Sequence, residues 1–409
     1  MTSGTLHLQD SSGKPAFLPS NGEWQADPGF GVYVHIPFCR HRCHYCDFNT
    51  YEGLDALHAP YARALEREIR AAPGPRPATS VFFGGGTPTL LAADVLGRLL
   101  GAIRDTTGTA PGAEITVEAN PETVDERYFE ALLGYGFNRF SIGIQSLAPG
   151  VLRRLGREHS ADTALAALAA ARSAGVTNLN ADLIFGSPWE GPSDWLRSLH
   201  GVIEEDPEHV SAYALTVEEG TPLATQVATG REPDVDPDVQ AERHAVAEDV
   251  LGAAGYVRYE ISNWSRPGRA SRHNVLYWSA GDYAGFGAGA HGHEGGRRYW
   301  RTRLPRDFVA AVSAGAGSAG PGNEMGAGTE AGGETLSPQE RVAEAMMLGL
   351  RLRSGIDTAA FDARWGRDER LETVASGLCA QGWLERADGW LRLSRAGTMV
   401  ANDILCRFL

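Results

Sequence analysis

The sequence has no run of about 18 uninterrupted apolar residues, so it predicts no membrane-spanning helix. Its N-terminal region also lacks the basic, apolar and small-residue series of a secretory signal, and carries Asp10, Lys14 and Glu23 instead. We therefore expect a cytoplasmic protein. Basic residues are fewer than acidic ones. The chain has 37 Lys and Arg and 51 Asp and Glu, which gives a formal net charge of −14. Since phosphate backbones are held mainly by clustered Lys and Arg, no nucleic-acid partner is expected.

Cysteine is scarce as well, with five residues among the 409 of the chain. Cys39, Cys43 and Cys46 lie close together, whereas Cys379 and Cys406 stand alone and suggest small apolar residues or free thiols. An odd count fits poorly with a disulfide framework, which is also rare in a reducing cytoplasm. The cluster of three therefore predicts a metal site.

The spacing of the three cysteines leaves two kinds of metal site open. A structural zinc site takes four protein ligands, and His35, His41 and His44 lie near enough in the sequence to supply the missing one. An iron–sulfur cube held by three thiolates instead leaves one iron free to bind a further ligand. The spacing alone does not choose between zinc and iron.

Short apolar runs alternate with longer amphipathic stretches from Gly31 onward, which is typical of βαβ units around a parallel sheet. The expected strands are 31–36, 80–83, 114–118, 139–144, 178–184 and 209–215, and the expected helices are 57–71, 90–105, 125–134, 161–174, 193–205 and 237–254. Polar or glycine-rich motifs follow the strands at 37–46, 84–88, 118–121, 145–146 and 186–188. Because reactive groups collect at the carboxyl ends of parallel strands, we expect these motifs to meet at one rim.

Composition divides the chain into five regions. Residues 1–30 suggest a poorly ordered extension, 31–255 an α/β core, and 256–312 an extension rich in aromatic residues and glycine. Residues 313–336 are dominated by small residues and predict a flexible linker. In the tail, 337–409, Ser337, Pro338 and Glu340 form a helix-start pattern, and two helices followed by a hairpin suggest a winged-helix-like domain.

The cysteine loop, with Tyr45 directly before the last cysteine, and the glycine-rich Phe83–Pro88 that follows the next strand together resemble the radical S-adenosylmethionine (SAM) superfamily. The resemblance implies a partial (β/α)6 barrel and a [4Fe-4S] cluster bound by Cys39, Cys43 and Cys46. The open iron of such a cluster would chelate SAM and cleave it to a 5′-deoxyadenosyl radical. A structural zinc knuckle is then the less favoured alternative.

The same resemblance implies a set of SAM-binding residues. Glycine lets the backbone approach a ligand closely, an arginine fork suits a carboxylate, and acidic side chains suit ribose hydroxyls. The implied SAM-binding residues are Tyr33, Tyr45, Gly85, Gly86, Thr87, Glu118, Gln145, Arg157 and Asp182. Without the resemblance, each of them reads equally well as a polar residue at the mouth of a barrel.

Three motifs, Tyr33–Cys39, Gly84–Thr89 and Asp182–Pro188, resemble one branch of the superfamily. That branch holds the oxygen-independent coproporphyrinogen III dehydrogenases (HemN type) and the related haem chaperones (HemW type). The dehydrogenases carry a fourth cysteine two positions after the third, where this chain has Phe48. Phe48 therefore counts against porphyrinogen decarboxylation.

The segment His273–Trp278 matches the His-Asn-x-x-Tyr-Trp motif of the HemW type, which is associated with haem binding. The resemblance implies that His273 binds haem, and a neutral imidazole is a common axial ligand of haem iron. His291 and His293 are secondary candidates. The five arginines between 297 and 306 would suit haem propionates, but a solvated basic face beside aromatic residues is the favoured interpretation.

The leading hypothesis is therefore a haem chaperone that carries a SAM-liganded [4Fe-4S] cluster. It would pass haem to acceptor proteins, for which respiratory proteins are candidates. The alternative is an oxygen-independent coproporphyrinogen III dehydrogenase, and a third possibility is a radical SAM enzyme with another substrate. The sequence leaves open whether the protein is an enzyme.

Overall fold

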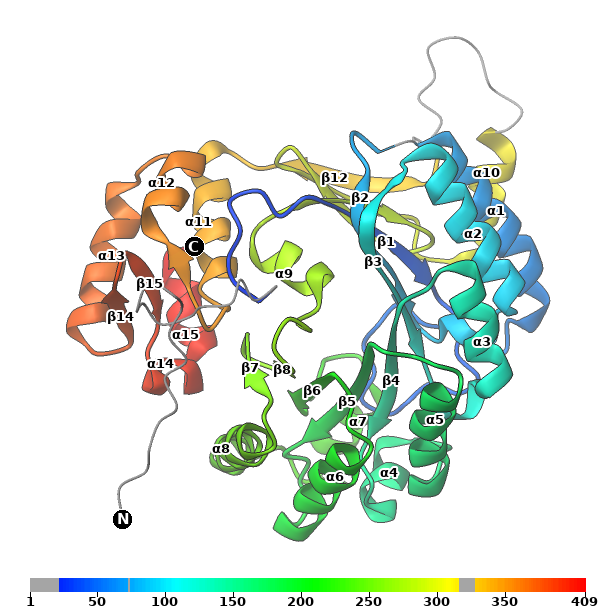
Figure 1. Cartoon of the computed structure of the whole chain (residues 1–409), viewed down its shortest axis with the longest axis horizontal. Coiled ribbons are helices and arrows are strands. Elements are labelled where there is room, and N and C mark those ends of the chain that lie inside the picture. The colour runs from blue at the N-terminus through cyan, green and yellow to red at the C-terminus, as the bar shows by residue number, and fades with distance from the viewer. Residues whose placement is uncertain (1–21, 73, 316–327) are drawn as a thin grey trace.

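The computed structural model describes residues 22–72, 74–315 and 328–409. A large curved sheet with helices on its outer side forms one part of the molecule, and a small α/β domain lies against its open side (Figure 1). None of the helices in these ranges has the length and apolarity to cross a membrane.

Six parallel strands form the middle of the sheet in sequence order, and each overlaps a predicted strand. They are β1 (Phe30–Ile36), β2 (Ala78–Gly85), β3 (Thr109–Ala119), β4 (Arg139–Gln145), β5 (Leu179–Phe185) and β6 (His209–Ala214). Side chains alternate between the two faces of each strand. In β2, Val81 and Phe83 join the apolar core under the helices, while Ser80 points inward and bonds to His273. The inner face is therefore available for polar chemistry.

The six predicted helices are also confirmed, with ends shifted by a few residues. They are α1 (His58–Ala71), α2 (Ala93–Thr106), α3 (Glu126–Tyr135), α5 (Ala161–Ser173), α6 (Pro192–Glu204) and α8 (Pro237–Ala253). Asp125 and Ser160 cap α3 and α5 by accepting backbone N–H groups. Three helices of seven residues, α4 (Pro149–Leu155), α7 (Pro222–Ala228) and α9 (Arg272–Trp278), were not predicted, because two turns are too short to show a helical period.

The region 256–312 extends this sheet on both sides. At one end β8 (Asn263–Ser265) pairs antiparallel with β6, and β7 (Val257–Arg258) pairs antiparallel with β8. At the other end β9 (Asp282–Phe286) pairs parallel with β1, followed by antiparallel β10 (His291–Glu294) and β11 (Arg297–Arg301). Within the described ranges the sheet has twelve strands and stays open, because β7 and β12 (Glu330–Thr335) are its two ends. Between β8 and β9, α9 (Arg272–Trp278) packs on β1 and β2.

The prediction of a flexible linker at 313–336 is wrong for the part that the structure describes. Residues 313–315 end α10 (Pro305–Gly315), and β12 pairs antiparallel with β11. A Cβ on Gly332 would lie 2.5 Å from the Trp300 ring, so glycine here allows β12 to pack closely on this ring. The small-residue composition of the segment had suggested flexibility instead. The other residues of the segment, 316–327, lie outside the described ranges.

The predicted N-terminal extension is partly folded. Trp24 is buried against Phe361 of the small domain, with ring centroids 6.0 Å apart, and the N–H of Gln25 donates to Ser279 Oγ at 3.1 Å. Phe30 already belongs to β1. A single tryptophan in a polar segment shows no hydrophobic periodicity, so the burial of Trp24 could not be predicted from the sequence. Residues 1–21 lie outside the described ranges.

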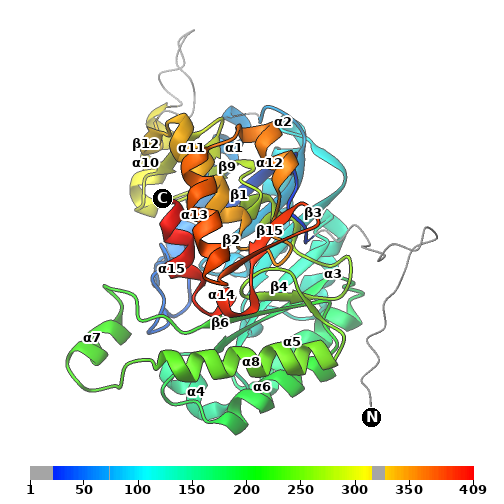
Figure 2. The same ribbon diagram turned by 90° about the vertical axis from the view of Figure 1, so that its left-hand side faces the viewer.

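The tail forms a small domain with its own apolar core. Ser337 and Glu340 make the predicted capping box at the start of α11 (Pro338–Gly349). The further elements are β13 (Ile356–Asp357), α12 (Thr358–Trp365), α13 (Glu369–Ala380), β14 (Leu384–Ala387), β15 (Trp390–Leu393), α14 (Arg395–Met399) and α15 (Ala401–Leu405). The hairpin β14–β15 and β13 form a three-stranded sheet beside the helices, as a winged-helix-like domain requires. Figure 2 shows this domain above α8. Short 3-10 turns occupy Asp55–Leu57, Pro88–Leu90, Pro121–Thr123 and Cys406–Phe408.

Candidate functional site

The cysteine loop leaves the carboxyl end of β1 and is fixed to the sheet by its backbone. The N–H of Cys39 donates to Tyr51 O at 2.9 Å, and the N–H of Tyr51 donates back to Pro37 O at 2.8 Å. The N–H of Cys46 donates to Cys43 O at 3.2 Å, which closes a tight turn between these two residues. All three cysteines are free thiols and partly buried. One short loop thus presents three sulfur donors at the rim of the barrel.

The groups around the sulfurs suit thiolates. Burial raises the pKa of Cys39 to about 11 and also raises the pKa of Cys46, so without a metal both thiols hold their protons. Arg157 Nη1 lies 3.4 Å from Cys43 Sγ, and Thr87 Oγ1 lies 3.9 Å from Cys39 Sγ. A cation and a hydroxyl near the sulfurs would compensate the charge that iron binding creates. The donor set therefore fits a cube held by three thiolates.

The three histidines considered as a fourth ligand have other partners. His35 bonds through Nδ1 to the Tyr33 hydroxyl and through Nε2 to Asn49 O. His44 Nδ1 bonds to Arg154 O at 3.1 Å, and His41 lies 3.6 Å from Glu52. These contacts favour the three-thiolate cluster over a closed zinc site.

The glycines at the end of β2 permit close contact with the cysteine loop. A Cβ on Gly86 would lie 2.5 Å from Phe38 O and 3.0 Å from Cys39 Sγ. Gly85 has φ of +116°, and a Cβ there would lie 2.5 Å from the His35 ring. The N–H groups of Gly86 and Thr87 donate to Ile36 O and Phe38 O. Glycine is required here because any side chain would push the strand away from the loop.

Arg157 connects the loop to the ends of β3 and β4. Its Nη2 donates to Asn120 Oδ1 at 2.7 Å and to Gly143 O at 3.0 Å, while its Nε is buried without a hydrogen-bond partner. Asn120 Nδ2 in turn donates to Thr87 Oγ1 at 2.9 Å. An unused donor beside the thiols fits a carboxylate ligand. Asn120 lies in the predicted polar motif 118–121 but was not named as a SAM-binding residue, although its place directly after a strand was a usable signal.

Two partly buried acids lie on the inner face of the barrel. Glu118 Oε2 accepts the N–H of Gly85 at 3.1 Å, and burial, with a contribution from Asp182, raises the pKa of Glu118 to about 7. Burial also raises the pKa of Asp182, against the opposing hydrogen bonds from Ser141 and Asn180. Both carboxyls also feel the positive charge of Arg139, and each can accept hydrogen bonds from ligand hydroxyls.

The remaining predicted SAM residues surround the same place. Tyr45 lies close to Cys43 and Arg157, whose charges act on its hydroxyl. Gln145 ends β4 with a left-handed φ of 63°, and a Cβ on Gly143 would lie 2.9 Å from its amide nitrogen. Tyr33 lines a cavity together with Gly85 and Glu118. The structure thus brings the predicted residues together, although their role toward SAM stays a prediction.

That cavity has a volume of about 800 Å³ and lies between the ends of β1–β3 and strands β9–β11; we call it the aromatic cavity. Most of its lining is aromatic or cationic. Phe48 is 64% exposed at its edge, and His291 is exposed with no hydrogen bond to its ring from any residue that the structure describes. The lining residues are Tyr33, His35, Asp47, Phe48, Asn49, Gly85, Glu118, Tyr277, Tyr283, Gly289, His291, Trp300, Arg301 and Arg303.

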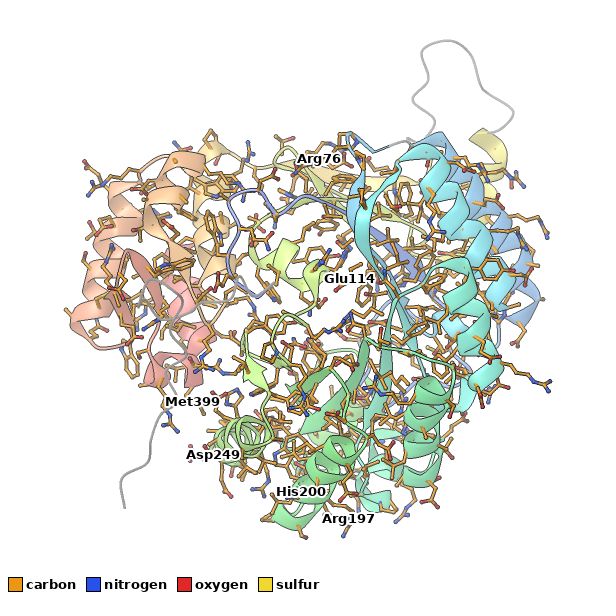
Figure 3. The ribbon with its side chains drawn as sticks, in the orientation of Figure 1. Arg76, Glu114, Arg197, His200, Asp249 and Met399 are labelled. Atoms are coloured by element: carbon orange, nitrogen blue, oxygen red, sulfur yellow. The ribbon has the colours of Figure 1, made fainter. Side chains whose placement is uncertain are left out.

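His273 does not line the aromatic cavity. It is 1% exposed, and its two ring nitrogens bond to Ser80 Oγ at 2.9 Å and to the Tyr277 hydroxyl at 2.8 Å. Its backbone N–H donates to Glu114 on β3, which Figure 3 labels beside α9. Burial lowers the pKa of His273 to about 3, so its ring is neutral. Haem ligation by His273 stays a prediction, and iron could reach its Nε2 only if the bond to Tyr277 were broken.

Most arginines of the 297–306 cluster are paired. Arg297 pairs with Glu330, and Arg298 contacts Glu334 and Glu344 at 3.0 Å each. Arg301 is buried 3.4 Å from Glu68. Arg303 is exposed and lines the aromatic cavity, so within this cluster it is the better-placed partner for an anionic ligand.

Comparison with known proteins agrees with this site. The model of the radical SAM superfamily matches residues 33–202, and that of the HemN C-terminal domain matches residues 336–400. Coproporphyrinogen III oxidase (HemN) from Escherichia coli, a radical SAM enzyme, has the same fold, with a TM-score of 0.77 at 22% identity over 97% of this chain and 93% of that chain. The fold and the three-cysteine loop define a radical SAM protein, whose domain implies a [4Fe-4S] cluster and SAM.

Closer relatives in sequence define the branch. The heme chaperone HemW of Mycobacterium tuberculosis (strain H37Rv) is 39% identical over 397 residues, which cover 96% of this chain and 97% of the relative. The heme chaperones HemW of Escherichia coli and Bacillus subtilis are 34% and 32% identical, over 93% and 92% of this chain and 98% of each relative. The chain belongs to the HemW family of radical SAM proteins.

Proposed function

We propose that this protein is a haem chaperone, which binds haem in the aromatic cavity and delivers it to acceptor proteins in the cytoplasm or at membrane complexes. The observation that carries the proposal is the aromatic cavity itself, which lies beside the three-cysteine loop. It has aromatic walls, the exposed imidazole of His291 and the exposed guanidinium of Arg303. The names of the relatives support the same function.

Each part of haem has a matching group in the aromatic cavity. The faces of Tyr283 and Trp300 suit an apolar macrocycle, and Arg303 at the edge suits a propionate. A volume of about 800 Å³ falls within the usual range for sites of organic cofactors. An open cavity also suits a ligand that must be released to another protein.

Within this proposal, His291 binds the haem iron and His273 positions the cavity wall. His291 is exposed on β10, with its ring centroid 6.2 Å from that of Trp300, and its ring nitrogens have no hydrogen-bond partner among the described residues. Tyr277 lines the cavity, and its hydroxyl forms a hydrogen bond with the ring of His273, which lies outside the cavity lining. The motif His273–Trp278 would thus contribute to haem binding without direct ligation.

Haem titration of the anaerobically reconstituted protein tests both the function and the ligand. We expect a saturable haem spectrum, at least about tenfold weaker binding and an altered spectrum in His291→Ala, and a smaller loss of affinity in His273→Ala. His200→Ala is a control, because His200 is exposed on α6 at the far edge of the barrel (Figure 3). No haem binding by the wild-type protein would contradict the proposed function. Loss of the haem spectrum in His273→Ala but not in His291→Ala would show that His273, and not His291, is the ligand of the haem iron.

The alternative function is oxygen-independent coproporphyrinogen III dehydrogenation. It is favoured by one observation, that Tyr33, Gly85 and Glu118 of the SAM site also line the aromatic cavity, so a porphyrinogen bound there would lie next to SAM. Phe48 at the cavity edge occupies the position of the fourth cysteine of the dehydrogenases and counts against it. Conversion of coproporphyrinogen III by the reconstituted protein with SAM and a reductant would establish the alternative.

A further inference from the structure

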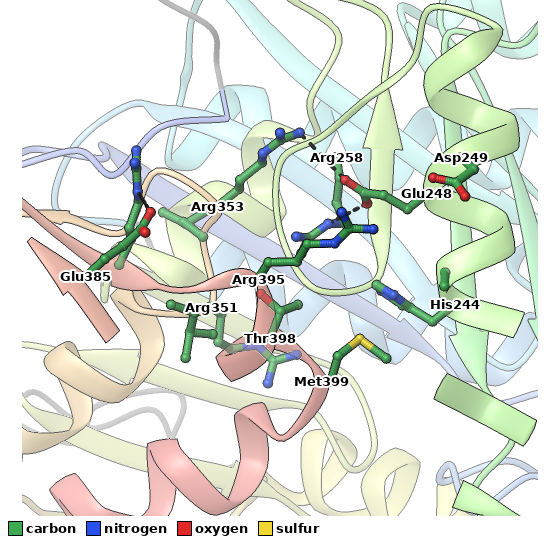
Figure 4. A pocket seen from close by; sticks show the side chains of 14 residues that line it. His244, Glu248, Asp249, Arg258, Arg351, Arg353, Glu385, Arg395, Thr398 and Met399 are labelled. Carbon is green, nitrogen blue, oxygen red and sulfur yellow. Dashed lines mark hydrogen bonds and ion pairs between the residues drawn. The ribbon is translucent and has the colours of Figure 1, made fainter. Parts of the chain in front are cut away.

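A second cavity, of about 430 Å³, lies where the barrel meets the small domain; we call it the interdomain pocket. One wall comes from α8 and β7, and the other from β15, α14 and the residues after α11. Figure 3 labels Asp249 on α8 and Met399 on the small domain on its two sides, and Figure 4 shows it from close by. It shares no lining residue with the aromatic cavity.

The interdomain pocket carries an excess of positive charge. Five arginines line it against three carboxylates, in a chain whose net charge is −14. Two of the carboxylates are already used, because Glu248 accepts from Arg258 at 2.7 Å and Glu385 accepts from Arg392 at 2.6 Å (Figure 4). Burial lowers the pKa of Arg258, and the nearby Arg353 lowers it further, against the opposing effect of Glu248. Positive charges are therefore crowded in this pocket.

Three of the five guanidinium groups have donors left over. Arg351 stacks on Trp278, 4.4 Å from the ring centroid, and its only acid partner in the described ranges is Glu260 at 3.9 Å. Its Nε is buried without a hydrogen-bond partner. Arg395 is exposed and forms no hydrogen bond or ion pair with any residue that the structure describes. Arg353 reaches Glu248 only at 3.9 Å, which is too long for a hydrogen bond.

We infer that the interdomain pocket binds a small phosphate-bearing molecule, with Arg351, Arg353 and Arg395 around the phosphate. Guanidinium forks match the geometry of phosphate oxygens, and an anion would relieve the repulsion among the crowded arginines. Leu352, Leu393 and Met399 form an apolar wall of the same pocket, which suits the organic part of such a molecule. The ligand would contact both domains and so hold them together.

Calorimetric titration of the full chain tests the site, with inorganic phosphate, pyrophosphate and ATP as probes at constant ionic strength. We expect saturable binding of pyrophosphate and ATP and a higher melting temperature when either is bound. Arg395→Ala and Arg351→Gln should each raise the dissociation constant by about tenfold or more, because each removes a charged hydrogen-bond donor. Met399→Ser should weaken ATP alone, because only the organic part contacts the apolar wall.

Arg386→Ala is the matched control, since Arg386 lies in the same small domain and pairs with Glu372 outside the pocket. Arg395 is exposed and has no partner in the part of the chain that the structure describes, so its variant should fold normally, which circular dichroism can check. Absence of saturable binding below about 10 mM, or equal weakening by Arg386→Ala and Arg395→Ala, would overturn the site. Equal affinity for phosphate, pyrophosphate and ATP would overturn the role of the apolar wall.

Discussion

The two sides of the central site are built differently. On the cysteine side, backbone hydrogen bonds join the loop to β2, and Thr87, Asn120 and Arg157 form one connected set of contacts. On the side of the aromatic cavity, His291 and Arg303 are exposed, and their side chains form no hydrogen bond with any residue that the structure describes. The first side suits a resident cluster that must be held rigidly, and the second suits a transported ligand that must leave.

The largest expected effect is the loss of the cluster on the cysteine side, while haem binding in the aromatic cavity is retained. Replacing Cys39, Cys43 or Cys46 by Ser should abolish the [4Fe-4S] cluster, because a three-thiolate site has no spare ligand. Haem affinity should change by less than about threefold, since the aromatic cavity keeps its lining. Iron and sulfide analysis together with haem titration measures both. Full cluster content in all three variants would contradict the metal site.

Gly86→Ala should damage the cysteine side through the backbone alone. The new Cβ would lie 2.5 Å from Phe38 O, so the loop must shift, at a cost of about 1–3 kcal/mol in the free energy of unfolding and with lower cluster content. Gly101→Ala in α2 is the control, since its Cβ would meet nothing within 4 Å. Chemical denaturation compares the two, and equal stability would mean that the strand does not pack tightly on the loop.

Glu118→Gln should change stability in a pH-dependent way. The pKa of Glu118 is about 7 in the folded protein and ordinarily 4.5, so folding favours the protonated form. Stability is therefore full below pH 4.5 and falls as the pH rises from 4.5 to about 7. At pH 8 the variant should be more stable than the wild type by up to about 3 kcal/mol, with little difference at pH 4.5.

Melting curves at the two pH values measure this effect, and Glu130→Gln on the exposed side of α3 is the matched control. A Glu118→Gln variant that is less stable at pH 8 would show that the carboxylate form is the favoured one. SAM affinity of the same variant should fall while its iron content is retained, because Glu118 contacts the glycine strand rather than the thiols.

The smallest expected effect lies on the side of the aromatic cavity. Trp300→Ala removes one aromatic wall and should weaken haem binding by about threefold to tenfold, as the loss of an aromatic contact of about 1 kcal/mol implies. Cluster content should stay unchanged. Haem titration checks the first expectation, and a simultaneous loss of cluster would show that the two sides are not independent.

The sequence predicted the six central strands and their helices because alternating apolar runs reflect burial directly. It also predicted that the SAM residues lie close together, since the carboxyl ends of parallel strands meet at one edge of the sheet. It could not place His273, because a motif does not show whether a side chain points to a cavity or to Ser80 and Tyr277 behind it. β12 was missed because glycine-rich composition looks the same in a linker and in a strand packed on Trp300.

Strand β1, which leads into the cysteine loop, has β9 as one of its two neighbours, although some 250 residues separate them along the chain. During synthesis, β1 must therefore wait as an unprotected sheet edge until residue 286 has left the ribosome. Pairings between such distant segments form slowly because closing a long loop is entropically costly. A fragment that stops at residue 255 would keep this edge open and tend to aggregate.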